Sequence, residues 1–238
     1  MIKKICILIT LLISYQIFAN HKPSYSAFNS KNVPLDHLLI DIMNIHKGTF
    51  IEVGAFNGIS SSNTKLLEEY YGWAGILIEP SANLFDDLCK NRPTAKCFSC
   101  ALGSFDQDNS YCFGDFKGHT MSSFTNRRRG SNSDKVLIRS LQSILDECDM
   151  YHINFFSLDT EGYELNILKG IDFKKTTFDY ILIEIYKDQY NTIIDLLAKH
   201  GYELFCCLSD YNRKDNPIWD GTHNDYLFIN KSLKASHT

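Results

Sequence analysis

Four short apolar runs of the sequence each end beside a carboxylate side chain. Glu52, Glu79 and Glu184 lie at the ends of three runs, and Asp159 with Glu161 follows the fourth. A carboxylate accepts hydrogen bonds from the hydroxyl groups of a ligand and can remove a proton from a reacting hydroxyl group. Open α/β sheets bind ligands at the carboxyl ends of their strands, so these positions predict one shared site if the runs are parallel strands.

A glycine-rich turn follows the first of these runs. Gly54-Ala55-Phe56-Asn57-Gly58 has the pattern G-x-x-x-G, which lets the backbone turn sharply and lets a ligand approach the exposed amides. The pattern lacks the central glycine of G-x-G-x-x-G that admits a pyrophosphate. This departure disfavours a nicotinamide-linked dehydrogenase and favours a ligand without phosphates. Taken alone, the loop is equally compatible with a tight turn that binds nothing.

Glu79 ends the second apolar run about 25 positions after Gly54. In nucleoside-binding folds, a carboxylate near this place accepts hydrogen bonds from the ribose hydroxyl groups. The alternative is a solvated carboxylate at a strand end. We predict that Gly54 and Glu79 converge on one nucleoside pocket at one rim of the sheet.

Strands and helices are predicted to alternate along most of the chain. The apolar runs are separated by segments with apolar residues at helical spacing, as at Leu35, Leu39 and Met43. This alternation predicts a mostly parallel sheet with helices on both faces. The last two strands have no helix between them and should be antiparallel. We expect strands at residues 49–53, 76–78, 95–102, 153–159, 178–186, 202–208 and 226–229.

Residues 103–133 are rich in Gly, Asn, Asp and Ser. So long an irregular piece in a compact domain tends to be functional, and we expect a lid or a substrate loop. His119 in this segment is a candidate base, because an unperturbed histidine titrates near neutral pH. The run Arg127, Arg128 and Arg129 could bind an acidic or phosphorylated acceptor, although charge runs are mostly solvated.

Several motifs together resemble the FkbM-family methyltransferases, and the resemblance covers roughly residues 49–230. It implies the class I methyltransferase fold, which is a Rossmann-like α/β three-layer sandwich with a mostly parallel seven-stranded sheet and an antiparallel C-terminal hairpin. It also implies S-adenosylmethionine as the cofactor. The motifs are FIEVGAFNG at 50–58, SNT at 62–64, GWAGI at 72–76, IEP at 78–80 and FFSLDTEGYE at 155–164.

The resemblance also assigns roles to single residues. In that family the glycine loop holds the methionine part of S-adenosylmethionine and the acid after the second strand holds the ribose, roles that fall here to Gly54, Gly58 and Glu79. Phe56 stands where many relatives have a small or polar residue, which leaves its role open. We expect cofactor contacts from Glu52, Gly54, Ala55, Asn57, Gly58, Glu79, Pro80, Ala101 and Asp159.

Asp159 and Glu161 lie where class I methyltransferases meet both the methyl donor and the acceptor. Methyl transfer to an alcohol needs the hydroxyl group held in line with the sulfonium and its proton removed, so the catalytic candidates are Asp159, Glu161 and His119. The alternative is that the two carboxylates cap the following helix. With Glu184 they could hold a divalent cation, as in related sugar methyltransferases, but we predict no metal site because carboxylates alone are ambiguous ligands.

The resemblance therefore predicts an S-adenosylmethionine-dependent O-methyltransferase that acts on a hydroxyl group of a small molecule, a sugar or a glycan. The 238 residues suffice for one such domain. A net charge of -4 and a pI of about 6.0 give no electrostatic reason to bind nucleic acid. Seven cysteines beyond residue 19 are an odd set that does not describe a closed disulfide framework, and we expect buried thiols. The oligomeric state is not indicated.

Lys3 and Lys4 precede an apolar stretch up to Ala19, which is typical of a signal peptide. The stretch is shorter than the roughly 20 apolar residues that span a bilayer, which favours cleavage over a retained membrane anchor. We predict a signal peptide or anchor at 1–19, a segment with a lead-in helix at 20–48 and the methyltransferase domain at 49–232. The chain would then be exported or membrane-attached rather than cytoplasmic. Because S-adenosylmethionine is made in the cytosol, a non-catalytic exported binding module with the same fold is the alternative function.

Overall fold

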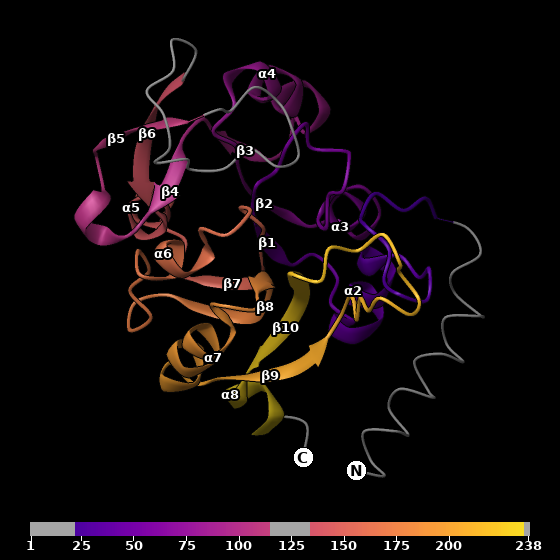
Figure 1. Cartoon of the computed structure of the whole chain (residues 1–238). Helices are drawn as coiled ribbons and strands as arrows, with labels where there is room; N and C mark the ends of the chain where they lie inside the picture. Colours follow the sequence, from indigo (N-terminus) through magenta and orange to yellow (C-terminus); the bar gives the residue numbers. More distant parts are fainter. Residues whose placement is uncertain (1–21, 115–133, 236–238) are drawn as a thin grey trace.

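The computed structural model describes residues 22–114 and 134–235 of the chain. At its centre is a seven-stranded sheet with the order β3-β2-β1-β7-β8-β10-β9 (Figure 1). The strands are β1 (Thr49–Val53), β2 (Ala74–Ile78), β3 (Lys96–Phe98), β7 (His152–Leu158), β8 (Thr177–Tyr186), β9 (Tyr202–Cys207) and β10 (His223–Asn230).

Helices cover both faces of this sheet. The core on one face includes side chains from α5 (Leu141–Glu147), α6 (Glu164–Leu168) and α7 (Tyr190–Lys199). The core on the other face includes side chains from α2 (Leu35–Met43), α3 (Lys65–Tyr71) and α4 (Ala82–Asn91). A short helix, α8 (Lys231–Ala235), follows the last strand. The three layers confirm the predicted sandwich.

Consecutive side chains along each central strand pack into the two cores on opposite faces of the sheet. In β1, Ile51 packs with α5 to α7, whereas Phe50 packs with α2 to α4. Ile181 and Leu182 of β8 divide in the same way. Successive side chains of a strand lie on opposite faces, so a strand covered on both faces must be apolar at nearly every position. This requirement explains why the continuous apolar runs form the centre of the sheet.

The strand directions bring one set of strand ends together. β1, β2, β3, β7 and β8 are parallel, whereas β10 is antiparallel to both β8 and β9. The carboxyl ends of the parallel strands and the amino end of β10 therefore lie at the same edge of the sheet. The mostly parallel sheet and its antiparallel C-terminal pair were both predicted.

The strand predicted at residues 95–102 is in fact two strands in two different sheets. β3 ends at Phe98, and β4 (Ala101–Gly103) pairs in parallel with β6 (Asp134–Ser140). β6 also pairs in antiparallel fashion with β5 (Tyr111–Gly114), which completes a small sheet with the order β4-β6-β5. The sequence prediction missed this sheet because β5 has exposed aromatic side chains and no apolar run to mark it.

The predicted irregular segment at 103–133 is therefore partly ordered. A 3₁₀ helix at Phe105–Gln107 and β5 occupy its described part. His119 and the arginine run at 127–129 lie outside the described residues, so their predicted roles stay predictions.

The segment before β1 packs onto the same core as the sheet. Leu35, Leu39 and Met43 of α2 are buried in the core with α3 and α4. Asp36 is fully buried, and its carboxylate accepts hydrogen bonds from the hydroxyl group of Ser24 (2.9 Å) and the amide of Tyr25 (2.8 Å). These bonds tie the chain before α2 to the helix.

Two further predictions concern export and the cysteines. In residues 22–114 and 134–235, no helix combines the length and apolar character needed to cross a bilayer, and the signal-like segment lies outside these ranges. The seven cysteines of the described chain are free thiols, of which Cys100 is buried and the others are half-buried. Burial raises the pKa of Cys100 to about 12, so this thiol is not a reactive one.

Candidate active site

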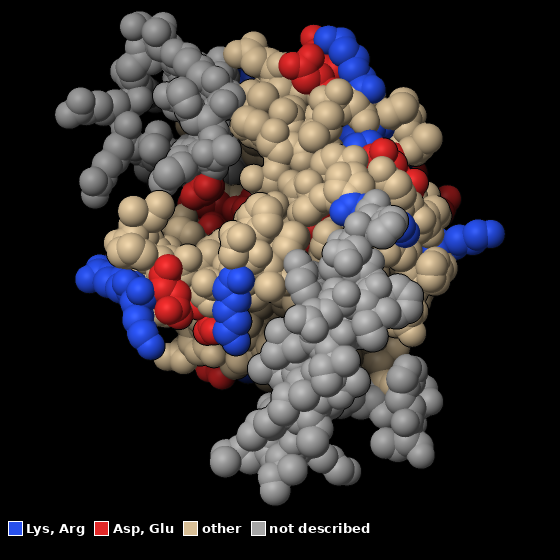
Figure 2. Space-filling model, turned by 90° about the vertical axis from the view of Figure 1, so that its right-hand side faces the viewer, with Lys and Arg blue, Asp and Glu red and all other residues tan. Residues whose placement is uncertain are grey.

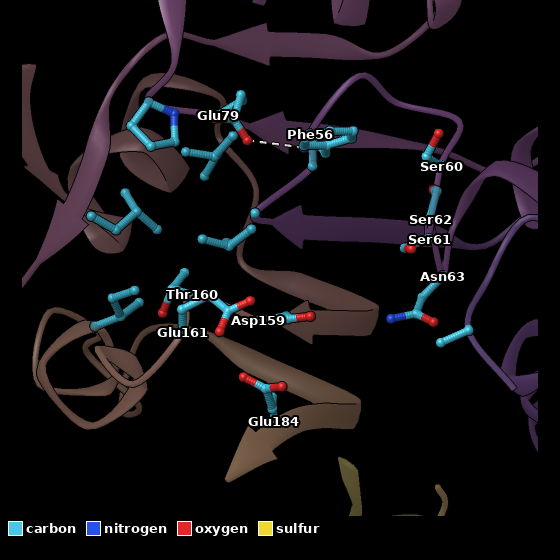
Figure 3. A pocket seen from close by; sticks show the side chains of 18 of the residues that line it. Phe56, Ser60, Ser61, Ser62, Asn63, Glu79, Asp159, Thr160, Glu161 and Glu184 are labelled. Carbon is cyan, nitrogen blue, oxygen red and sulfur yellow. Dashed lines mark hydrogen bonds between the residues drawn. The ribbon is translucent and has the colours of Figure 1, made fainter. Parts of the chain in front are cut away.

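A cavity of about 310 Å³ opens at the edge of the sheet where the strand ends meet (Figure 3). Gly54 and Glu79 both line it, so the structure brings together the two positions that were predicted to converge. Ala55, Pro80, Ala101, Asp159 and Glu161 also line the cavity. Figure 3 shows Glu79 beside Phe56 at one end and the side chains of Asp159, Glu161 and Glu184 gathered at the other.

The turn after β1 fits because residue 54 has no side chain. Gly54 has a φ of +82°, and a Cβ atom there would lie 1.9 Å from the backbone carbonyl O of Asp159. Only glycine allows both this left-handed backbone and this contact. The end of β7 therefore packs directly against the turn, which puts Asp159 beside residues 54–56.

The backbone amides of the turn are used within the protein. The amides of Gly54 and Ala55 both donate to the carbonyl of Ile78 at 3.1 Å, and the amide of Phe56 donates to Glu79 Oε2 at 2.9 Å. The prediction that this loop offers exposed amides to a ligand is therefore wrong for residues 54–56. These bonds hold the turn against the end of β2.

Asn57 and Gly58 are not among the residues that line the cavity. The side-chain oxygen of Asn57 accepts hydrogen bonds from the amides of Ile59 (3.0 Å) and Ser60 (2.9 Å). A Cβ atom at Gly58 would lie 2.6 Å from Cγ of Arg92, so glycine is needed here for packing against α4. The structure therefore gives both residues a role in shaping the loop rather than direct contact with the cavity.

Glu52 also lies behind the cavity wall. Its carboxylate accepts hydrogen bonds from the hydroxyl group of Ser62 (2.8 Å), the amide of Asn63 (2.7 Å) and the hydroxyl group of Thr64 (2.7 Å). Ser62 and Asn63 in turn line the cavity. The prediction of direct cofactor contact by Glu52 is not supported, because its oxygens already hold this wall in place.

Arg92 completes the support of this wall. Its side chain is fully buried and donates to the carbonyl of Gly58 (3.2 Å) and the hydroxyl group of Thr64 (3.0 Å). Its guanidinium group also lies 3.6 Å from Glu52 and forms an ion pair with Glu68. This arginine could not be predicted from the sequence, because no motif identifies its partners.

Glu79 is buried, with 6% of its surface exposed. Besides Phe56, the amide of Ser81 donates to its carboxylate at 2.9 Å. Burial raises the pKa of Glu79 to about 7, although the two amides act in the opposite direction. A carboxylate in this position has lone pairs left for hydroxyl groups of a ligand in the cavity.

The opposite end of the cavity collects carboxyl groups. Burial and the charges of their neighbours raise the pKa of both Asp159 and Glu184 well above the ordinary range. Asp225 also lines the cavity, and burial raises its pKa to about 6. Neighbouring carboxyl groups that repel one another are not all ionised at once, so some of them keep protons when no ligand is bound.

Glu161 and Glu164 have separate roles. The hydroxyl group of Tyr186 donates to Glu161 at 2.9 Å, whereas Glu164 accepts hydrogen bonds from the amides of Thr160 (2.8 Å) and Gly162 (3.1 Å). Glu164 therefore stabilises the turn before α6. The capping role weighed for Asp159 and Glu161 falls to this neighbouring residue.

Within the described ranges, no cluster of three or more His, Cys, Asp and Glu side chains has a geometry that could hold a metal ion.

Several lining residues were missed by the sequence prediction. Asp225 was missed because the prediction considered only carboxyl ends of strands, whereas the antiparallel β10 brings its amino end to the same edge. The motif SNT at 62–64 was recognised without a role. The missed lining residues include Ser60, Ser61, Ser62, Asn63, Tyr211, His223 and Asp225.

The support of the cavity wall can be tested through Arg92. Arg92→Met keeps the length of the side chain but leaves Glu52 and Glu68 buried without their cation, so we expect the free energy of unfolding to fall by about 3–5 kcal/mol. Urea denaturation measures this loss. Lys90→Met is the control, because it removes only the exposed ion pair with Asp87 and should cost less than about 1 kcal/mol. Equal losses in the two variants would contradict the role of Arg92.

The burial of Glu79 predicts a particular dependence of stability on pH. The folded pKa of about 7 exceeds the ordinary value of 4.5, so the folded chain binds the proton more tightly and loses stability as the pH rises through this window. Between pH 5 and pH 8 we expect the wild type to lose about 2 kcal/mol relative to Glu79→Gln, measured by urea denaturation of the ligand-free protein.

Glu69 supplies a control of the opposite sign. Hydrogen bonds from Tyr25 and Lys65 lower the pKa of this exposed carboxylate. The wild type should therefore show no such loss relative to Glu69→Gln over the same pH range. If the free energy of unfolding of the wild type depended on pH in the same way as that of Glu79→Gln, the prediction would be wrong.

Comparisons with known proteins identify the family. The chain matches the methyltransferase FkbM domain over residues 52–204, which is more than half of its length. A search of curated protein sequences found no match.

Solved structures with a similar arrangement are distant in sequence. A TehB-like SAM-dependent methyltransferase from Corynebacterium glutamicum is 12% identical, with a TM-score of 0.43 over 83% of this chain and 88% of that chain. A ribosomal protein L11 methylase from Lactobacillus delbrueckii subsp. bulgaricus is 11% identical, with a TM-score of 0.47 over 83% of this chain and 77% of that chain. The assignment therefore rests on the family match: the chain belongs to the FkbM methyltransferase family and is an S-adenosylmethionine-dependent methyltransferase.

Proposed function

We propose that this methyltransferase transfers the methyl group to a hydroxyl group of a small molecule, a sugar or a glycan. The observation that carries the proposal is that Asp159 lines the same cavity as Glu79, and that its backbone packs directly against the Gly54 turn. A hydroxyl acceptor must lose a proton when it is methylated, and a positioned carboxylate can accept that proton.

The residues present fit S-adenosylmethionine. The cavity volume of about 310 Å³ is within the range of small-molecule pockets. The lining side chains of Leu84, Ala101 and Leu102 are apolar and suit a planar base, while the Glu79 carboxylate suits the ribose hydroxyl groups. When bound, the cofactor supplies an electrophilic methyl group on a positively charged sulfur.

The chain itself would contribute binding, orientation and proton removal. Glu79 would hold the ribose, and the turn at residues 54–56 would form the floor beneath the cofactor. Asp159 would accept the proton of the acceptor hydroxyl group. Its raised pKa makes it a stronger base than an ordinary carboxylate once it is ionised.

Cofactor binding is tested by calorimetry with S-adenosylmethionine. We expect the wild type to bind and Glu79→Ala to bind at least about tenfold more weakly, because about two hydrogen bonds to a charged acceptor are lost. Asp87→Ala, which removes an exposed carboxylate, should bind like the wild type. No binding by the wild type, or equal binding by Glu79→Ala, would refute this role.

Proton removal is tested with Asp159→Asn. A labelled-methyl assay on cell extracts should show a rate lower by about 10²–10⁴-fold, whereas the affinity for S-adenosylmethionine should change only a few-fold. The asparagine has nearly the same shape and removes a carboxyl group that is costly to ionise, so the fold should persist. A wild-type rate in this variant would show that another group accepts the proton. A labelled methyl group found on an amine nitrogen rather than on an ether oxygen of the product would exclude a hydroxyl acceptor.

A further inference from the structure

One buried carboxylate oxygen in the cavity has no hydrogen-bond donor. Glu184 lines the cavity with 8% of its surface exposed, and its Oε2 atom has no hydrogen-bond partner in the described part of the chain. Buried charged and polar atoms are normally paired, because an unpaired one loses its hydration without compensation. The donor for this atom must therefore come from the protonated neighbouring carboxyl groups or from a ligand.

Acidic side chains strongly outnumber basic ones around Glu184. Asp159 and Glu161 come from the end of β7, Glu164 from α6 and Asp225 from β10, and all four carboxyl groups act on Glu184. His223 is the only basic side chain in the described residues that pairs with it, at 3.4 Å and through Oε1. One histidine cannot balance these carboxyl groups, and it leaves Oε2 without a donor.

An aromatic side chain lies at the same end of the cavity as these carboxyl groups. Tyr211 lines the cavity, and its hydroxyl group donates to the carbonyl of Phe28 at 2.6 Å, which fixes the position of the ring. The faces of aromatic rings attract ammonium groups. On the face seen in Figure 2, acidic side chains lie recessed in a hollow, and Lys and Arg side chains project from the surface below it.

This end of the cavity lies away from the expected position of the cofactor. Glu79 follows β2 and Glu184 lies on β8, and the sheet order places three strand spacings between them. At about 4.8 Å per spacing, the two strands are roughly 14 Å apart. The turn at Gly54, where the methionine part is expected, is still two spacings from Glu184. The unpaired carboxylate therefore faces the acceptor end.

We propose that the acceptor carries a protonated amine, which binds between Glu184 and Asp225 beside the ring of Tyr211. The inference rests on the proposed methyl transfer to a hydroxyl group and narrows the acceptor to an amine-bearing alcohol, such as an amino sugar. An ammonium group donates hydrogen bonds to both carboxylates and supplies the positive charge that the cluster lacks.

The same cluster predicts that protons are released when the amine binds. The titratable groups around the amine position are those that line this end of the cavity, together with Glu164 and Tyr186, which do not line it but act on Glu184 or on Glu161. The lining groups at this end are Asp159, Glu161, Glu184, Asp225, His223 and Tyr211. Mutual repulsion and burial keep protons on some of these carboxyl groups when no amine is bound. A bound ammonium favours the ionised carboxylates, so these protons pass to the buffer.

The test is calorimetry on the full chain saturated with S-adenosylhomocysteine, using glucosamine and N-acetylglucosamine as matched probes. We expect glucosamine to bind at least tenfold more tightly, with a heat that differs between two buffers of different ionisation enthalpy because protons are released. Glu184→Gln and Asp225→Asn should each remove most of this preference. Asp188→Asn, which changes an exposed carboxylate outside the cavity, should retain it.

The outcomes separate this inference from the proposed function. Equal affinities for the two sugars, including no measurable binding of either, overturn the amine site while S-adenosylhomocysteine still binds. A preference that persists unchanged in both Glu184→Gln and Asp225→Asn also overturns it. Failure of the wild type to bind S-adenosylhomocysteine would instead count against the proposed function itself.

Discussion

The close approach of the ends of β1 and β7 is the constraint on which the site depends. At Gly54 the backbone turns with a positive φ, and the carbonyl of Asp159 occupies the space that a side chain would need. Any other residue would push β7 away from the turn. Because this contact is possible, the Asp159 side chain, the turn and the end of β2 all face one cavity.

Two sets of carboxylates then have different tasks in the fold. Glu52 and Glu79 hold backbone amides, the first in the wall at residues 62–64 and the second in the turn at Phe56. These hydrogen bonds hold the turn and the cavity wall in position. Glu79 alone combines this task with a place on the cavity surface.

The carboxyl groups at the other end are costly to ionise. Asp159 raises the cost of ionising Glu184, and Asp225 adds to the cost for both. The described residues pair these groups only with His223 and a few hydrogen bonds. Stability alone would favour apolar side chains at these positions. Such an arrangement is typical of functional sites, where a bound ligand lowers the cost of ionising groups that repel one another in the free protein. This is the physical basis of both the proposed base and the proposed amine site.

The architecture and the location of the site can be predicted from the sequence. Short continuous apolar runs bounded by turns are typical of strands covered on both faces, and their alternation with helices predicts a parallel sheet whose carboxyl ends share an edge. The positions of Gly54, Glu79 and Asp159 followed from that rule. The same rule could not find Asp225, which reaches the edge from the start of an antiparallel strand.

The role of each polar side chain depends on packing between elements that are distant in the sequence. Glu52 and Gly58 lie within the recognised motif, yet Arg92, which contacts both, lies about 30–40 residues further along the chain. The small sheet of β4, β5 and β6 likewise depends on pairing between distant segments. Local patterns report which face of an element is apolar. Whether a carboxylate faces a cavity or a buried arginine depends on packing between elements, which no short stretch of sequence records.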